Sequence, residues 1–183
     1  MADFFLMRGA YQRANLVFRL YCIFVLALLF TFEEHPVKAM GIRRVMSSKA
    51  KILVVDDEIP VATMIAFLLT RVGCEVKTAL NAERALRLAQ TERFDLITID
   101  VEMPGTSGFE LLKRLKQIPH FNDTPMVFVS GQATIENQQY ALGELGAVDF
   151  IEKPFDALEF VPRLLSHVKV KSDSVAMMGS TVT

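Results

Sequence analysis

The sequence is poor in the residues that usually mark metal, redox or disulfide-rich proteins. It has 183 residues, of which two are cysteine, three are histidine and none is tryptophan. Two cysteines provide no disulfide framework, and the scattered histidines do not have the spacing of metal ligands. The motifs C-x-x-C, H-E-x-x-H and G-x-G-x-x-G are also absent, so zinc-enzyme and dinucleotide-binding functions have no support. A formal net charge of −1 excludes a uniformly basic nucleic-acid-binding protein.

Apolar and charged residues are distributed unevenly along the chain. Apolar residues number 31 in residues 1–50 and 63 in the remaining 133. Residues 1–50 carry seven Lys or Arg and three Asp or Glu, a net charge of +4, whereas the remainder carries 13 and 18, a net charge of −5. We therefore expect an apolar and basic extension over residues 1–46, a folded domain over 48–170 and a disordered polar tail over 171–183.

The N-terminal extension contains an apolar run that has three interpretations. The run extends from Leu16 to Phe32 if Arg19 is included, which is shorter than the roughly 20 residues of a membrane-spanning helix. Basic residues before the run and glutamates after it suit a membrane anchor or a signal segment. Met46 offers a third alternative, in which residues 1–45 come from an over-extended gene model. We expect a cytoplasmic protein, with an inner-membrane tether through the run as the alternative.

From Lys51 onward, short apolar runs alternate with amphipathic helical patterns. The continuous apolar run from Lys51 to Val55 is typical of a strand buried on both faces of a parallel sheet. Five alternations within about 120 residues predict an α/β fold with helices on both faces of that sheet. The expected strands are residues 51–55, 75–79, 94–99, 126–129 and 148–151, and the expected helices lie near 59–72, 82–89, 109–115, 134–145 and 156–168.

Polar side chains follow four of the five expected strands. Asp56 and Asp57 follow the first strand, Asp100 the third, Ser130 the fourth and Lys153 the fifth. Ligand sites in open α/β sheets lie beyond the carboxyl ends of the strands, so we expect these side chains to converge. Three close carboxylates call for a hard cation, and oxygen ligands favour Mg²⁺. A lysine and a hydroxyl suit phosphoryl oxygens, and an Asp carboxylate can accept a phosphoryl group.

These strand ends belong to longer stretches in the order and spacing of a known family. The stretches are ILVVDDE from Ile52, IDVEMPG from Ile99 with SGFEL from Ser107, VSG from Val129 and GAVDFIEKPF from Gly146. In these stretches, residues 51–169 resemble the receiver domain of bacterial two-component response regulators, the CheY-like family. The resemblance implies a flavodoxin-like, doubly wound sheet of five parallel strands in the order 2-1-3-4-5.

The resemblance also implies a phosphorylation site with a metal ion. Asp100 would accept the phosphoryl group from the phosphohistidine of a histidine kinase or a histidine phosphotransfer protein. Mg²⁺ would be held by Asp57, Asp100 and the backbone carbonyl of Glu102, and Asp56 would assist directly or through water.

The remaining implied roles concern a conformational switch. Ser130 and Lys153 would bind phosphoryl oxygens, and the bond before Pro154 would be cis, which would aim Lys153 into the site. Ser130 would move towards the phosphoryl group, and Phe150 would fill the space that it leaves. Partners would then contact the face formed by the fourth helix, the fifth strand and the fifth helix. A homodimer through this face is less secure because Pro162 interrupts the last helical pattern.

The function expected from the sequence is phosphorelay signalling by a stand-alone receiver that is not an enzyme. Only about a dozen residues follow Val170, so we expect no output domain, and no basic element predicts nucleic-acid binding. The domain would signal by contacts with a downstream protein target. One alternative is a Mg²⁺-dependent phosphatase that uses an aspartyl-phosphate, although such enzymes have a second Asp where Glu102 stands. A second alternative is an unphosphorylated receiver-like scaffold.

Overall fold

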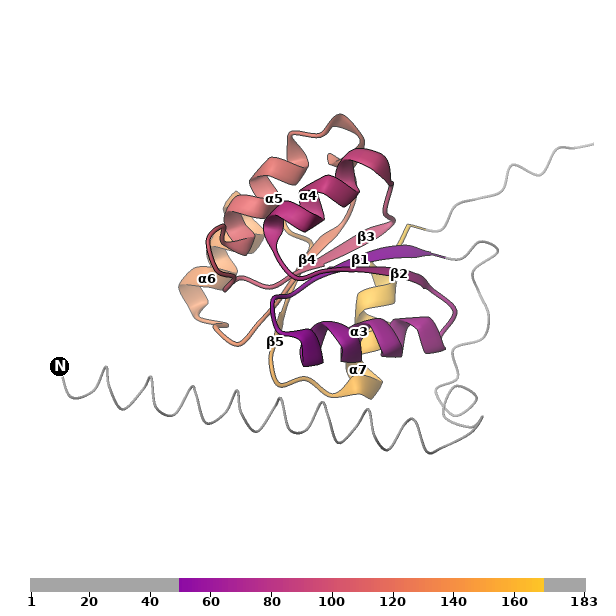
Figure 1. Cartoon of the computed structure of the whole chain (residues 1–183). Helices are drawn as coiled ribbons and strands as arrows, with labels where there is room; N and C mark the ends of the chain where they lie inside the picture. Colours follow the sequence, from indigo (N-terminus) through magenta and orange to yellow (C-terminus); the bar gives the residue numbers. More distant parts are fainter. Residues whose placement is uncertain (1–49, 170–183) are drawn as a thin grey trace, which may run out of the picture.

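Five parallel strands alternate with helices in the computed structural model, which describes residues 50–169 (Figure 1). The strand order in the sheet is β2-β1-β3-β4-β5, which confirms the predicted order and the doubly wound fold. Every neighbouring pair of strands is parallel. The strands are β1 (Lys51–Val55), β2 (Glu75–Ala79), β3 (Leu96–Ile99), β4 (Met126–Ser130) and β5 (Asp149–Glu152).

Four of the five α-helices, α4 to α7, begin at residues whose side chains accept hydrogen bonds from the first helical turn. The side chains of Asn81, Ser107, Thr134 and Asp156 each accept a bond from a backbone N–H two or three residues later, which satisfies an amide that has no partner within the helix. The helices are α3 (Ile59–Arg71), α4 (Ala82–Thr91), α5 (Gly108–Lys116), α6 (Ile135–Gln139) and α7 (Ala157–Ser166), with a short 3-10 turn, η1 (Pro119–Phe121).

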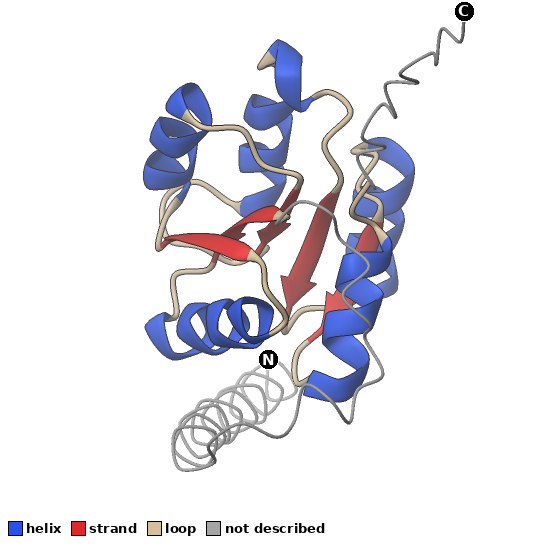
Figure 2. Ribbon diagram, turned by 90° about the vertical axis from the view of Figure 1, so that its right-hand side faces the viewer, coloured by secondary structure: helices blue, strands red, loops and turns tan. Residues whose placement is uncertain are grey.

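The helices form two layers on opposite faces of the sheet (Figure 2). Helices α3 and α7 pack on the face that receives Ile52 and Val54 of β1. Helices α4 and α5, with the segment around α6, pack on the face that receives Leu53 and Val55. Because both faces of β1 are buried, its sequence is a continuous apolar run rather than an alternating one.

The predicted helix over residues 134–145 is divided into two parts. Helix α6 is regular only to Gln139, and Tyr140–Glu144 forms a π turn, η2. In this turn the N–H of Leu145 donates to the carbonyl of Tyr140 over 3.0 Å, a bond that spans one residue more than in an α-helix. Apolar spacing over so few residues does not distinguish the two windings, so the sequence could not show this division.

Most other predicted boundaries differ from the observed ones by one or two residues, as at the start of β3 and the end of α7. Strand β3 begins at Leu96, two residues later than predicted. Phe94 lies before the strand and stacks on Phe121, with ring centroids 6.3 Å apart. Phe94 is therefore apolar because it belongs to the core between α4, α5 and the sheet, not because it lies in a strand. Pro162 lies inside α7, which continues to Ser166.

Within residues 50–169, no helix is both long enough and apolar enough to cross a membrane. The apolar run from Leu16 to Phe32 and the tail over 171–183 lie outside the described residues.

Candidate functional site

The carboxyl edge of the sheet brings together the side chains that the sequence places at the strand ends. Strands β1 and β3 are in register, with Val55 opposite Ile99, so Asp56 and Asp100 leave the sheet side by side. The N–H of Asp100 donates to the carbonyl of Val55 over 2.9 Å, which continues the ladder by one residue. The sheet therefore fixes the spacing of these two carboxylates.

Three carboxylates and one ammonium form the centre of the site. Asp56, Asp57 and Asp100 each offer an oxygen within 4.8 Å of the others. Asp56 and Asp100 are buried, with 1% and 5% of their surfaces exposed, whereas Asp57 is half-buried. Lys153 is also buried, and its Nζ lies 2.6 Å from Oδ2 of Asp56 and 3.5 Å from Oδ2 of Asp100. One lysine offsets only part of the charge of three carboxylates.

The electrostatic environment differs between the lysine and Asp100. Burial opposes the charge of Lys153, but Asp56 and Asp100 more than compensate and raise the pKa of the ammonium. Burial raises the pKa of Asp100 to about 7. Lys153 opposes this rise, and the charges of Asp56 and Asp57 add to it. Burial also raises the pKa of Asp56. A further positive charge at this edge would stabilise the ionised form of Asp100.

Lys153 reaches the site from the end of β5. Its backbone N–H donates to the carbonyl of Ser130 over 2.9 Å, so the end of β5 is held against the end of β4. The peptide bond between Lys153 and Pro154 is cis, as the resemblance implied.

The side chains of Ser130 and Phe150 lie on the face of the sheet that α4, α5 and α6 cover. Ser130 is completely buried, and its Oγ accepts a bond of 3.2 Å from the N–H of Gln132 in its own loop. The ring of Phe150 is buried against Phe128, with centroids 5.9 Å apart. Glu102 lies in the loop after Asp100 with its side chain exposed, and the role of its carbonyl as a metal ligand stays a prediction.

Gly108, which the sequence analysis did not single out, supports the backbone of Asp100. It is the first residue of α5, and a Cβ added there would lie 2.0 Å from the backbone oxygen of Asp100 and 2.9 Å from Cγ2 of Ile99. The helix can approach the Asp100 backbone only because residue 108 has no side chain. The sequence offered one signal for this role of Gly108. A glycine stands next to the start of the expected helix, where most other residues would be at least as favourable.

Two amide side chains that the sequence analysis also missed hold the loop after Ser130. Nδ2 of Asn137 donates to the carbonyl of Gln132 over 2.9 Å, and Nε2 of Gln138 donates to the carbonyl of Ala133 over 3.0 Å. Both side chains come from α6, so the loop and the helix are linked.

Comparisons with known proteins agree on one family. Residues 52–165 match the family model described as the response regulator receiver domain. The chain is 41% identical over 113 residues to the phosphate regulon transcriptional regulatory protein PhoB of Pseudomonas aeruginosa, which covers 62% of this chain and 49% of that protein. It is 39% identical over 117 residues to the alkaline phosphatase synthesis transcriptional regulatory protein PhoP of Bacillus subtilis, which covers 62% and 46%. The chain thus spans about half the length of the curated relatives it matches.

Solved structures give the same result for the fold. The chemotaxis protein CheY4 of Vibrio cholerae superposes with a TM-score of 0.62 at 34% identity, covering 67% of this chain and 100% of that one. A BeF3-activated DrrB receiver domain superposes with a TM-score of 0.59 at 27% identity, covering 66% and 97%.

Proposed function

This chain belongs to the response regulator receiver domain family, and from that premise we propose that Asp100 is its phosphoacceptor and that protein contacts transmit the signal. The observation that carries the proposal is the close approach of three carboxylates and one lysine at the carboxyl edge. Asp56, Asp57 and Asp100 present oxygens within 4.8 Å of one another, and Nζ of Lys153 lies 3.5 Å from Oδ2 of Asp100. In this proposal the chain is a signalling domain without turnover of external substrates.

The reaction that we propose is transfer from a phosphohistidine. A carboxylate oxygen of Asp100 attacks phosphorus, the P–N bond to the imidazole breaks, and the imidazole leaves as the O–P bond of an acyl phosphate forms. Such transfers depend mainly on positioning and on stabilising charge at the equatorial oxygens. Lys153 supplies a buried positive charge beside the acceptor, and the hydroxyl of Ser130 can donate a hydrogen bond to another phosphoryl oxygen.

The same carboxylates fit a magnesium ion. Asp56, Asp57 and Asp100 would hold it together with the backbone carbonyl of Glu102. Hard oxygen donors favour Mg²⁺, and the negative charge that Lys153 leaves uncompensated supports a divalent cation at this edge. When bound, the ion supplies a second positive charge for the phosphoryl oxygens.

Acetyl phosphate tests the proposal directly. The protein with Mg²⁺ and acetyl phosphate is expected to gain the mass of one phosphoryl group, and peptide mapping is expected to place it on Asp100. The variant Asp95→Asn is a matched control, since Asp95 precedes β3 at the opposite edge of the sheet, where it accepts a bond from the N–H of Lys51. A mass gain that persists in Asp100→Asn, or the lack of any gain in the wild type, would contradict the proposal.

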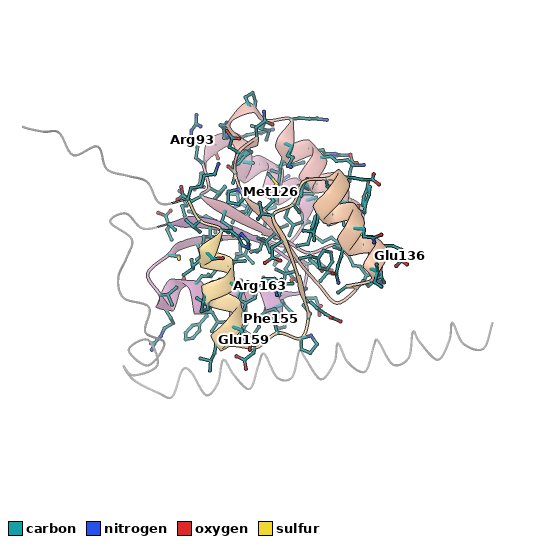
Figure 3. All side chains as sticks on the ribbon, turned by 180° about the vertical axis from the view of Figure 1, so that it is seen from behind. Arg93, Met126, Glu136, Phe155, Glu159 and Arg163 are labelled. Atoms are coloured by element: carbon teal, nitrogen blue, oxygen red, sulfur yellow. The ribbon has the colours of Figure 1, made fainter. Side chains whose placement is uncertain are left out.

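We infer that a protein phosphodonor docks on exposed apolar side chains that follow the strand ends at this edge, which we call the apolar rim. Among the described residues, six large apolar side chains are exposed, and four of them follow strand ends at this edge. The exposed fractions are 61% for Ile59, 41% for Leu80, 70% for Ile135 and 66% for Leu158. Figure 3 shows Glu136 on α6, well apart from Phe155, which precedes α7, and from Glu159 on α7. Exposed apolar patches are typical of protein interaction sites, so these four side chains are candidates for contact with the donor.

The variant Leu158→Asp is therefore expected to slow transfer from a phosphorylated histidine phosphotransfer protein by about tenfold or more. The rate with acetyl phosphate is expected to stay within about twofold of wild type, because a small donor needs no docking surface. Stopped-flow or radiolabel transfer assays measure both rates. Val148→Asp is the control, since Val148 is exposed before β5 at the opposite edge. Equal rates in the two variants with the protein donor would show that the rim does not bind it.

The proposed output surface is the face formed by α6, β5 and α7, where a downstream protein or a second copy of the chain would bind. Phosphorylation adds a charge of about −2 to Asp100, and we expect Ser130 to move towards it. On this face Arg163 donates two bonds of 2.7 Å to Asp149 and one of 3.3 Å to the carbonyl of Phe150. These bonds fasten α7 to β5, so we expect α6 to take up most of the change.

A further inference from the structure

The π turn after α6 contains one more residue than a regular helix end requires. In an α-helix that ends at a glycine with positive φ, the residue before the glycine donates to the carbonyl four residues earlier. The residue after the glycine donates to the carbonyl five residues earlier. Gly146, with φ of 66°, occupies that position here, but the two bonds span five and six residues. Leu145 donates to Tyr140 over 3.0 Å, and Ala147 donates to Ala141 over 2.9 Å. In α-helical winding the acceptors would instead be Ala141 and Leu142.

Contacts from α5 hold Tyr140 in this winding. The ring of Tyr140 packs edge-on against Phe109, with centroids 5.2 Å apart and planes at 89°. Nζ of Lys113 lies 5.5 Å from the centroid of the same ring. If the turn became α-helical with Gly146 fixed, Ala141 would take the place of Tyr140, and both ring contacts would be lost. The ring of Tyr140 therefore stabilises the π winding specifically.

A second contact from α5 anchors the other end of the turn. Nζ of Lys116 donates to the carbonyl of Leu145 over 2.7 Å and to that of Gly146 over 2.9 Å. The φ of 66° favours glycine at position 146, and a Cβ added there would lie 2.9 Å from this Nζ, so the lysine would have to shift. A positive charge at the carboxyl end of a helix is favourable. Because this end is held, a residue released by the turn would move towards α6 and the loop before it.

That loop is the one expected to move when Asp100 is phosphorylated. It follows Ser130, and its carbonyls at Gln132 and Ala133 accept the side-chain bonds of Asn137 and Gln138 from α6. A displacement of Ser130 towards Asp100 would therefore pull on α6 as well as on the loop. The chain needs additional length for this displacement unless the whole helix moves, and the π turn contains one residue that can supply it.

We propose that the π turn over Tyr140–Glu144 is a one-residue register switch, held in the π winding by Tyr140 in the unphosphorylated protein and converted to α-helix on phosphorylation. The proposal rests on the proposed phosphorylation of Asp100. It makes Tyr140 and Lys116 positioning residues. The ring contacts of Tyr140 stabilise the π winding, and Lys116 holds the end of the turn, so the residue that leaves the turn lengthens the chain on the side of Ser130. The face formed by α6, β5 and α7 would change because α6 advances by one residue.

Hydrogen-bond couplings between backbone ¹⁵N and ¹³C nuclei test the register directly, because they identify the acceptor of each amide. In the free 183-residue chain the N–H of Leu145 is expected to couple to the carbonyl of Tyr140. With Mg²⁺ and beryllofluoride as the phosphoryl analogue, the coupling is expected to move to Ala141. A coupling that stays with Tyr140 in the beryllofluoride complex, or that already lies with Ala141 in the free protein, overturns the proposal.

Binding of beryllofluoride to variants provides an independent test. Tyr140→Ala removes contacts that favour only the π winding, so beryllofluoride affinity is expected to rise by about five- to tenfold. Gln139→Ala is the control, since Gln139 is exposed in the same helix. Lys113→Met, which leaves α6 intact, is expected to act in the same direction by about twofold to fivefold and serves if the Tyr140 variant does not fold. Equal affinities in the variants and the control overturn the proposal.

The two proposals fail in different ways. If beryllofluoride with Mg²⁺ gives no bound ¹⁹F signal in the wild type, the proposed phosphorylation site is wrong, and the register switch is rejected with it. If the bound signal appears but the Leu145 coupling and the variant affinities do not change, only the register switch is rejected.

Discussion

The variant Asp100→Asn is expected to be more stable than the wild type at pH 8 when no metal is present. In the folded protein the pKa of Asp100 is raised from 3.8 to about 7, chiefly by burial and also by the charges of Asp56 and Asp57. At pH 8 the wild type must therefore keep a buried carboxylate ionised beside two others. An amide removes this charge, and the gain in the free energy of unfolding is on the order of 4 kcal/mol at most.

The pH dependence of stability follows from the same pKa. Between about pH 4 and pH 7 the folded protein retains a proton on Asp100 that the unfolded chain has lost. The contribution of Asp100 to the free energy of unfolding therefore decreases as the pH rises through this window and is constant above it. For Asp100→Asn this decrease is expected to be absent. Mg²⁺ is expected to reduce the difference between the two proteins, because a cation stabilises the ionised carboxylate.

Urea unfolding in EDTA at pH 5 and pH 8 measures these differences. The control Asp95→Asn is expected to lower stability at both pH values, because it weakens the bond of 2.8 Å from the N–H of Lys51 to the Asp95 carboxylate. If Asp100→Asn were less stable than the wild type at pH 8 without metal, the carboxylate would be stabilised by its surroundings, and our account of the site electrostatics would be wrong.

The variant Gly108→Ala is expected to lose at least about 3 kcal/mol of stability together with phosphorylation. The added Cβ would lie 2.0 Å from the backbone oxygen of Asp100 and 2.9 Å from its carbonyl carbon. Backbone atoms cannot move aside as the end of a flexible side chain can. The start of α5 and the backbone of Asp100 must therefore separate, which displaces the acceptor carboxylate from Lys153 and from the other carboxylates.

Gly143→Ala is the matched control for this substitution. Residue 143 is exposed in η2, its φ is not positive, and a Cβ added there meets no atom within 4 Å. Its stability is expected to stay within about 1 kcal/mol of wild type, on the stabilising side, because Ala is the better helix former. Thermal unfolding and acetyl phosphate labelling of both variants distinguish a steric effect at Gly108 from a general intolerance of replacing glycine. Normal labelling of Gly108→Ala would show that the approach of α5 does not position Asp100.

The sequence was most informative where one local pattern had one structural solution. β1 has the predicted bounds because a short apolar run that ends in charged residues is typical of a strand buried on both faces of a sheet. β2 also has the predicted bounds, but it is an edge strand with the sequence EVKTA, and of its residues only Ala79 is fully buried. The sequence alone also indicated which residues lie at the carboxyl edge, since the carboxyl ends of parallel strands lie at one edge of the sheet. These residues are Asp56, Asp57, Asp100, Ser130 and Lys153.

The tertiary structure decided the features that depend on contacts between distant segments. The π winding after α6 depends on Tyr140 meeting Phe109 and on Lys116 meeting Leu145, which lie about thirty residues apart in the chain. The need for glycine at position 108 depends on how closely α5 approaches Asp100. Burial and the neighbouring charges raise the pKa of Asp100.

The sequence by itself determined the order of the elements and the residues at the sheet edge, because these follow from local periodicity and parallel topology. Distances, burial and helix register were decided only in the folded chain, because they arise from packing between elements that local sequence does not encode.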